Sequence, residues 1–157
     1  MDPLFAFAIK EEILRNILKT HNIVLVIGRP GTGKTVTSLK VGAELGPVCY
    51  FNGGGRLSPP SDLPEGVTVI DDMNGFTGAT QADMLLIVDA AHRLSGKDRE
   101  VLNGLTGPDG GRVCKMILIT PSVMDAIDFL AFLDVVVRFR QDTAEMLVSR
   151  LRDIHNV

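Results

Sequence analysis

The sequence has little cysteine and no long apolar run, and each absence excludes a class of protein. Its two cysteines, Cys49 and Cys114, lie inside apolar segments with no second Cys or His at ligand spacing, which indicates buried thiols rather than a metal site. No apolar run approaches the roughly 20 residues that span a bilayer, and the start, MDPLFAFAIKEE, lacks the basic residues of a signal peptide. We therefore expect a soluble, cytoplasmic protein in a reducing compartment, with no membrane partner.

The net charge and the length set further limits. The chain has 157 residues and a formal net charge of −3, so the field of the whole protein does not favour nucleic acid or an acidic membrane. Its apolar fraction of 45% and charged fraction of 22% are those of a globular protein with one packed core. Because no internal repeat or low-complexity tract interrupts the chain, we expect a single domain over residues 1–157.

Apolar runs alternate with helical spacings along most of the chain. Residues 9–20 predict a leading amphipathic helix, and residues 23–27 (IVLVI) predict a buried strand. The same patterns predict strands at 48–51, 67–70 (a short candidate), 84–88, 116–119 and 135–139, and helices at 34–45, 95–106, 122–133 and 142–154. Apolar strands that alternate with helices indicate a parallel sheet covered on both faces. We therefore predict an α/β fold, a three-layer αβα sandwich around a mainly parallel five-stranded sheet.

Residues 52–66 (NGGGRLSPPSDLPEG) form a long connection rich in glycine and proline. A connection of this length is often functional, and Arg56 gives it a candidate contact to nucleic acid. A surface connection without a ligand is the alternative.

The most specific motif lies directly after the first predicted strand. Residues 28–35 (GRPGTGKT) match G-x-x-x-x-G-K-(S/T) between a strand and a helix, as phosphate-binding loops do. The motif predicts binding of a nucleoside triphosphate, which we take to be ATP, together with Mg²⁺. The candidate nucleotide-binding residues are Gly28, Arg29, Pro30, Gly31, Thr32, Gly33, Lys34, Thr35 and the adjoining Val36.

The fixed positions of this loop have chemical reasons. Gly28 lets the chain turn sharply off the strand, while Gly31 and Gly33 permit backbone conformations that aim N–H groups at phosphates. The helix that follows adds the positive end of its dipole. Lys34 places a cation on the β and γ phosphates, and Thr35 offers its hydroxyl to Mg²⁺.

A phosphate loop also needs an acidic partner for the metal ion. Asp89 ends the apolar run MLLIV, where its carboxylate can hold Mg²⁺ together with Thr35. The alternative role, a cap at the end of the strand, would leave the charge of the magnesium uncompensated. We therefore predict Asp89 and Thr35 as the metal-binding residues.

No carboxylate follows Asp89 to orient an attacking water molecule. The next residue is Ala90, where hydrolysing enzymes of this kind often have a Glu. Asp71 and Asp72 are catalytic candidates in its place if the short strand before them lies alongside, and a solvated turn is the alternative. His92 is a further candidate, either structural or a sensor of the nucleotide state.

These residues together resemble a known family. GRPGTGKT is similar to the AAA+ form of the loop, and LLIVDAAHRLS resembles the hhhhDEAHxLS segment of clamp-loader-like AAA+ ATPases, with Ala90 at the position of the Glu. ILITPS resembles the sensor strand that follows, which makes Thr120 a candidate sensor of the γ-phosphate. The resemblance covers residues 13–139, with RecA-like ATPases as near relatives. It implies an ATPase that assembles into a homo-oligomer or a larger complex.

Three parts of that family are missing or displaced. One is the Glu that Ala90 replaces. The segment 129–134 also lacks the family's arginine finger, for which Arg112, Arg138 and Arg140 are alternatives. The helical lid is absent or reduced to the predicted 142–154 helix, whose arginines, Arg150 and Arg152, we expect to be solvated.

Three functions remain to be compared. The leading hypothesis is a magnesium-dependent ATPase that acts with a macromolecular partner in DNA replication, recombination or packaging. The second is a nucleotide-dependent interaction subunit with little hydrolysis, which Ala90 and the missing finger favour. The third is a small nucleoside or nucleotide kinase with Arg93, Arg99 and Arg112 as scattered lid candidates. No Asn-Lys-x-Asp motif occurs, which disfavours a GTPase.

Overall fold

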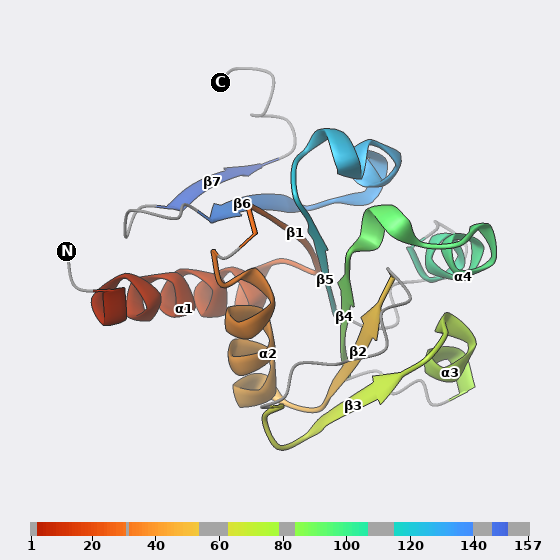
Figure 1. Ribbon diagram of the computed structural model, residues 1–157, viewed down its shortest axis with the longest axis horizontal. Coiled ribbons are helices and arrows are strands. Elements are labelled where there is room, and N and C mark those ends of the chain that lie inside the picture. The colour runs from red at the N-terminus through yellow and green to blue at the C-terminus, as the bar shows by residue number, and fades with distance from the viewer. Residues whose placement is uncertain are drawn as a thin grey trace.

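The computed structural model describes residues 3–30, 32–53, 63–78, 84–106, 115–139 and 146–150 of the chain. Helices and strands alternate along it, as the apolar patterns predict (Figure 1). The elements are α1 (Pro3–Thr20), β1 (Ile23–Ile27), α2 (Lys34–Leu45), β2 (Val48–Asn52), β3 (Val67–Ile70), α3 (Met73–Gly78), β4 (Leu85–Asp89), η1 (Ala91–Arg93), α4 (Gly96–Thr106), β5 (Lys115–Thr120), η2 (Met124–Phe132), β6 (Val135–Phe139) and β7 (Met146–Arg150).

The strands form one seven-stranded sheet in the order β3-β2-β4-β5-β1-β6-β7. All neighbouring pairs are parallel except β6 and β7. The α/β class and the mainly parallel sheet are therefore confirmed, and the predicted number of five strands is wrong. The short candidate at 67–70 is a true edge strand, β3, and β7 was not predicted as a strand.

The segment 142–154 is not the terminal helix that its apolar spacing suggested. Its described part, Met146–Arg150, is β7, which pairs antiparallel with β6 from Phe139↔Met146 to Val135↔Arg150. The helical spacing of apolar residues across 142–154 does not record pairing with a neighbouring strand. The free backbone groups along the outer edge of β6 favour the extended form, because a strand placed there satisfies them.

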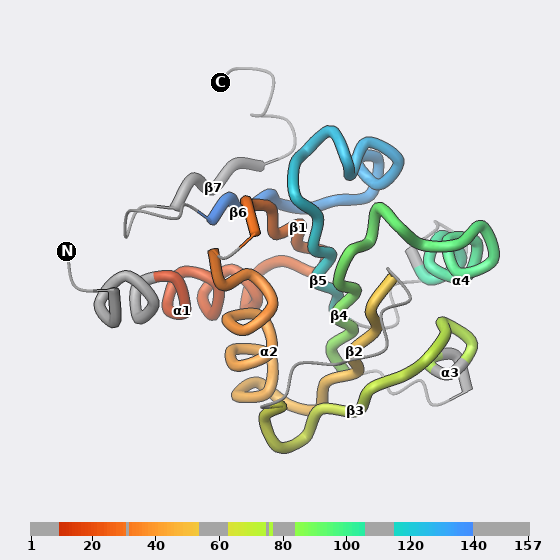
Figure 2. The backbone as a smooth tube through the Cα atoms, in the orientation of Figure 1, coloured from red at the N-terminus to blue at the C-terminus, as the bar shows by residue number. Residues whose placement is uncertain are grey.

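Both faces of the sheet are covered, which confirms the three-layer arrangement (Figures 1 and 2). On one face α1 and α2 pack against alternate strand residues such as Val24 and Val26. On the other face α3, α4, η1 and η2 pack against the intervening residues such as Leu25 and Ile27. Since successive side chains of a strand point to opposite faces, a continuous apolar run fills both cores.

Helix α2 lies unusually close to the sheet at Gly42. A Cβ atom at this position would come within 2.7 Å of Leu85 Cδ2 on β4 and 3.3 Å of Val48 Cγ2 on β2. Real Cβ atoms essentially never approach that closely, so the helix rests on β4 through bare backbone. The helix that begins at the phosphate loop is therefore packed directly against the strand that ends at Asp89.

Serine side chains cap the starts of α4 and η2. The N–H of Asp98 donates to Ser95 Oγ (3.2 Å) at the start of α4, and the N–H of Asp125 donates to Ser122 Oγ (3.3 Å) before η2. Element η2 is a 3-10 helix rather than the expected α-helix. Its two fully buried side chains, Ala126 and Phe129, are three residues apart, which matches the 3-10 period.

Within the described ranges, no helix combines the length and the apolar content needed to cross a bilayer.

Candidate phosphate-binding and metal site

The candidate site lies at the carboxyl edge of three neighbouring strands. Strand β5 pairs with β1 on one side and with β4 on the other, and all three are parallel. The loop after β1, Thr120 at the end of β5 and Asp89 at the end of β4 therefore reach the same edge. This is the edge at which open parallel sheets bind ligands.

The described part of the loop is closed by its own hydrogen bonds. Thr32 donates to the carbonyl oxygen of Arg29 through its hydroxyl (2.8 Å) and through its N–H (3.3 Å). At Gly28, where φ is +155°, a Cβ would lie 2.8 Å from Phe139 O and 2.9 Å from Thr32 Oγ1. Steric exclusion of any side chain thus explains the first glycine of the motif. Gly31 lies outside the described residues.

The loop leads into α2 through a left-handed residue. Gly33 has φ 82° and is the N-cap of α2, and its carbonyl oxygen accepts the N–H of Thr37 (2.9 Å). A glycine cap has no side chain to occupy the first N–H groups of the helix, so these donors are open to an anion. Val36, in the first turn, is 64% exposed.

Lys34 reaches back over the loop. Its Nζ donates to the carbonyl oxygen of Gly28. Partial burial lowers the pKa of Lys34, and the negative charge of Asp89 offsets part of that shift. The Lys34 ammonium therefore lies between Gly28 and Asp89, where it could pair with a phosphate bound in the loop.

Asp89 is the centre of a small polar cluster. Its Oδ2 accepts the hydroxyl of Thr35 (2.7 Å) and the hydroxyl of Tyr50 (2.8 Å), and its Oδ1 accepts the N–H of Ala90 (2.9 Å). The two predicted metal-binding residues, Thr35 and Asp89, are thus in direct contact. They offer Mg²⁺ two hard oxygen ligands, and this ion usually takes its remaining ligands from water and phosphate.

A larger protein-only metal cage is not formed. In the part of the chain that the structure describes, no three His, Cys, Asp or Glu side chains gather as a metal-binding group. A Thr hydroxyl beside one carboxylate fits an ion that is shared with a bound nucleotide better than an ion held by the protein alone.

Sequence reasoning missed Tyr50 as part of this cluster. It is the only tyrosine of the chain, and it lies in β2, with its side chain buried. Burial and the neighbouring Asp89 both raise the pKa of Tyr50, so the phenol stays protonated and donates. A phenol within an apolar strand was the available signal, because a buried Tyr usually has a hydrogen-bond partner for its hydroxyl.

Thr120 reaches the edge between the loop and Asp89. Its side chain is 1% exposed, and its hydroxyl donates to the carbonyl oxygen of Ser122 (2.8 Å). The next carbonyl, that of Pro121, accepts the N–H of Gly28 at 3.3 Å. The structure therefore links the candidate sensor segment to the base of the loop.

Asp71 and Asp72 are not brought to this cluster. They are exposed and follow β3, which pairs with β2 and not with β4. Strands in a sheet are about 4.8 Å apart, so β3 lies roughly 10 Å from β4 and farther still from the loop. The condition for their catalytic role, a strand alongside Asp89, is not met.

Ala90 has a left-handed backbone, with φ 50° and ψ 46°. The backbone of Gly53 lies against it: the N–H of Gly53 donates to Asp89 O (2.7 Å), and a Cβ on Gly53 would be 2.6 Å from Ala90 O. His92 follows in η1, and its Nδ1 is buried without a partner among the described atoms. Neither residue supplies a carboxylate next to the metal-binding pair.

The candidate arginines are only partly placed. Arg29 is exposed in the loop, and Arg138 is exposed on β6, in register with Ile27 of β1. Arg99 forms an ion pair with Asp128 and thereby joins α4 to η2. Outside the described residues lie Arg56, Arg112, Arg140 and Arg152, as do Cys114 and most of the 52–66 connection.

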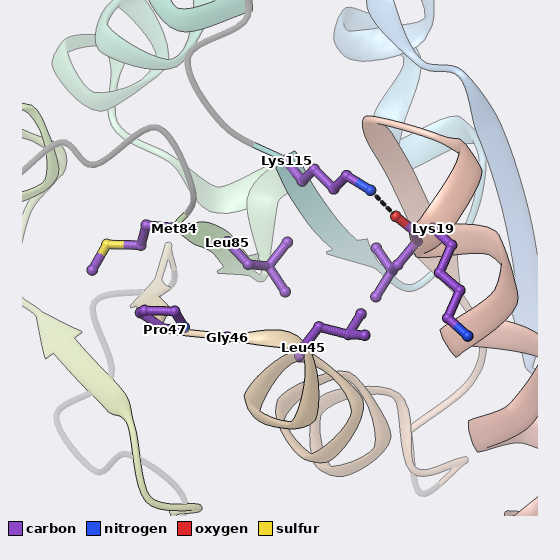
Figure 3. A pocket seen from close by; sticks show the side chains of 9 residues that line it. Lys19, Leu45, Gly46, Pro47, Met84, Leu85 and Lys115 are labelled. Carbon is purple, nitrogen blue, oxygen red and sulfur yellow. Dashed lines mark hydrogen bonds between the residues drawn. The ribbon is translucent and has the colours of Figure 1, made fainter.

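A hollow lies at the opposite end of the sheet from the phosphate loop (Figure 3). It measures about 270 Å³ and is lined by residues such as Leu45, Pro47, Met84 and Leu85. The Nζ of Lys115 donates to the carbonyl oxygen of Leu18 at the end of α1. Lys115 therefore caps the C-terminal end of α1. The hollow is separate from the phosphate loop.

The sheet order, with the glycine-rich loop after β1 and the acidic end of β4, gives the chain an α/β fold like those of the RuvB motor and the VirB11 ATPase. Over 102 residues, 65% of this chain, the sequence is 30% identical to the Holliday junction branch migration complex subunit RuvB of Prochlorococcus marinus. The chain spans about a quarter, 25%, of the length of that relative. No protein-family model matches the chain.

Two solved structures share the fold. The RuvB Holliday junction branch migration motor of Thermotoga maritima superposes with a TM-score of 0.50 and 14% identity over 85% of this chain and 42% of that chain. The VirB11 ATPase from the Brucella suis type IV secretion system, in complex with sulphate, gives a TM-score of 0.50 and 14% identity over 96% and 55%. At such identities the likeness concerns the fold alone.

Proposed function

We propose that this chain binds ATP with Mg²⁺ at residues 28–35 and hydrolyses it while acting with a macromolecular partner. The observation that supports this most directly is the contact between Thr35 Oγ1 and Asp89 Oδ2, with Lys34 beside it. A hydroxyl, a carboxylate and a lysine at the start of a helix are the groups that P-loop ATPases apply to a magnesium nucleotide.

The residues of the chain divide the work as follows. Lys34 exchanges its contact with Gly28 O for oxygens of the β and γ phosphates. Gly33 and the first turn of α2 present N–H groups to the phosphates. Thr35 and Asp89 would hold Mg²⁺, which would supply positive charge against the phosphates of the bound nucleotide. Thr120 reports on the state of the γ-phosphate through the segment that contacts Gly28.

DNA is the partner that we propose, in replication, recombination or packaging. The support is the 30% identity to RuvB, whose name assigns it to Holliday junction branch migration. We propose that the chain works as a homo-oligomer or within a larger assembly, and the support is the resemblance to AAA+ ATPases. Because residues 129–134 contain no arginine finger, a monomer or a heteromer is the alternative. Measuring the particle mass with and without ATP tests the assembly.

Magnesium-dependent ATP turnover, measured with and without DNA, tests the whole proposal. Lys34→Ala is expected to abolish nucleotide binding. Lys40→Ala is the matched control, since Lys40 lies on the same helix but forms an exposed ion pair with Glu11 (2.9 Å). Retained micromolar affinity and turnover in Lys34→Ala would overturn the proposal.

A second candidate function is a nucleotide-dependent interaction subunit that hydrolyses ATP poorly. Ala90 favours it, because this residue gives no carboxylate beside Asp89 to orient water. ATP binding that changes partner affinity, with turnover no faster than that of Asp89→Asn, would select this function over the ATPase. We retain the kinase as a weaker third proposal, which phosphate transfer to a nucleoside or nucleotide would support and transfer to water only would exclude.

A further inference from the structure

A lysine outside the motif contacts the phosphate loop. The Nζ of Lys10, on α1, donates to the carbonyl oxygen of Thr32 at 3.2 Å, across 22 positions of sequence. The side chain is 3% exposed, and its ammonium lies 5.3 Å from the centre of the Phe139 ring. The ring belongs to the last residue of β6, whose carbonyl borders Gly28.

Burying the Lys10 ammonium beside the loop costs free energy, and an apolar side chain could pack there without this cost. Burial lowers the pKa of Lys10, which means that the fold disfavours its charged form. An apolar side chain of similar length would fill the space without this penalty. The ammonium contacts the face of Phe139 and the carbonyl oxygen of Thr32, and the second of these contacts joins it to the loop.

The position of Lys10 is fixed by the docking of α1 on α2. The neighbouring Glu11 pairs with Lys40 at 2.9 Å, and Arg15 pairs with Glu44 at 2.7 Å. These ion pairs join the two helices at the residue after Lys10 and about one turn further along α1. The ammonium is therefore presented to the loop by a helix that is held in register with α2.

Holding one carbonyl oxygen also orients the amide that follows it. The C=O of Thr32 and the N–H of Gly33 belong to one planar, trans peptide, so they point in opposite directions. Lys10 binds the oxygen from the α1 side, so the N–H of Gly33 points away from Lys10. Gly33 has a left-handed backbone, and a glycine peptide is free to flip unless something fixes it.

We infer that Lys10 is a positioning residue of the phosphate loop, which fixes the Thr32–Gly33 peptide so that the Gly33 N–H faces the phosphates. The inference rests on the proposed nucleotide binding. It assigns to α1 a part in ligand recognition that no residue of the loop motif provides.

The test compares Lys10→Met, which keeps the packing length, with Lys10→Arg, which keeps a cation. Affinities for ATP, ADP and adenosine are measured on the full chain, together with the Gly33 amide resonance of the nucleotide-free protein. For Lys10→Met we expect ATP and ADP affinity to fall about tenfold, the effect of one charge-assisted hydrogen bond. Adenosine affinity is expected to stay unchanged, and Lys10→Arg to recover part of the loss.

Lys40→Met is the matched control, since it removes an α1–α2 ion pair without touching the loop. Equal losses for all three ligands, or a Lys40→Met loss equal to that of Lys10→Met, would overturn the inference. The Gly33 amide provides a readout that needs no nucleotide. If it does not shift in Lys10→Met, Lys10 does not position this peptide, whatever the fate of the proposed ATPase. Should Lys10→Met fail to fold, Lys10→Gln, which also removes the cation, is measured in its place and read in the same way.

Discussion

The hydroxyl of Tyr50 and the carboxylate of Asp89 are 2.8 Å apart, and the oxygen that Tyr50 contacts is the same oxygen that accepts the hydroxyl of Thr35. Two donors from two different elements, β2 and α2, thus hold one carboxylate oxygen at the end of β4. A third donor, the N–H of Ala90, holds the other oxygen. The carboxylate is therefore fixed in orientation before any metal ion arrives.

Tyr50→Phe tests this arrangement with the loss of one atom. We expect the free energy of unfolding to fall by about 1–2 kcal/mol, because the buried Tyr50 hydroxyl loses its hydrogen bond to the half-buried carboxylate of Asp89. We also expect more Mg²⁺ to be needed for half-maximal nucleotide binding, because Asp89 becomes free to rotate. Chemical denaturation and magnesium titrations measure the two effects, and an unchanged magnesium requirement would show that Tyr50 serves packing alone.

Gly53→Ala is expected to destabilise the fold by about 1–3 kcal/mol, because the new methyl group must displace backbone. Its Cβ would meet Ala90 O at 2.6 Å and Asp89 O at 3.2 Å. Magnesium-dependent binding should weaken with it, since the backbone that moves carries Asp89. Thermal unfolding of the variant measures the first effect.

Gly104→Ala is the matched control for this substitution. Gly104 lies within α4, and no atom stands within 4 Å of a Cβ placed there. Alanine should raise the free energy of unfolding by up to about 1 kcal/mol through helix propensity. A Gly53→Ala protein that is as stable as the Gly104→Ala protein would contradict the tight packing at Ala90.

Nucleotide affinity should depend on the ionisation of Lys34. Burial lowers the pKa of Lys34 in the free protein, and a bound phosphate would raise it, so binding takes up a proton. Affinity is therefore full below the pKa of the free protein and declines as the pH rises through it, earlier than for a solvent-exposed lysine. Titration with a fluorescent ATP analogue from neutral to alkaline pH measures the decline, and a constant affinity across that range would contradict it.

Ala90→Glu is expected to raise ATP turnover at least about tenfold, a modest share of what a positioned general base contributes. Turnover of Asp71→Ala and Asp72→Ala should equal that of the wild type, because β3 lies outside β2 at the edge of the sheet. Steady-state ATPase assays measure all three. A brisk wild-type rate that Asp71→Ala or Asp72→Ala abolishes, with no gain in Ala90→Glu, would show that the base is elsewhere.

The sequence predicted those elements whose pattern is determined by burial on both sides. The runs at 23–27 and 116–119 became β1 and β5, since an apolar run between turn residues has few other solutions in a sheet. The edge strands were harder. β3 has two exposed central residues, and β7 exists because β6 offers it a free edge, a property of the tertiary structure that spacing does not record.

The candidate site divides in the same way. Lys34, Thr35 and Asp89 were found because their spacing to glycine and to the ends of apolar runs is local. Their binding roles stay predictions, although the structure places the three together. Tyr50 and Lys10 reach the site from β2 and α1, and which distant side chains meet at one strand end depends on the strand order and helix docking rather than on a motif.

Because Gly42 has no side chain, α2 packs closely against β4, and the two elements form one packed unit. A Cβ there would lie 2.7 Å from the tip of the Leu85 side chain, so α2 and β4 pack closely at this point. One end of this unit holds Thr35 and Asp89, and the other reaches the Leu45 end of the hollow opposite the loop. A larger side chain at Gly42 would therefore move α2 away from β4. We expect this to lengthen the Thr35–Asp89 contact, which lies about two helical turns away.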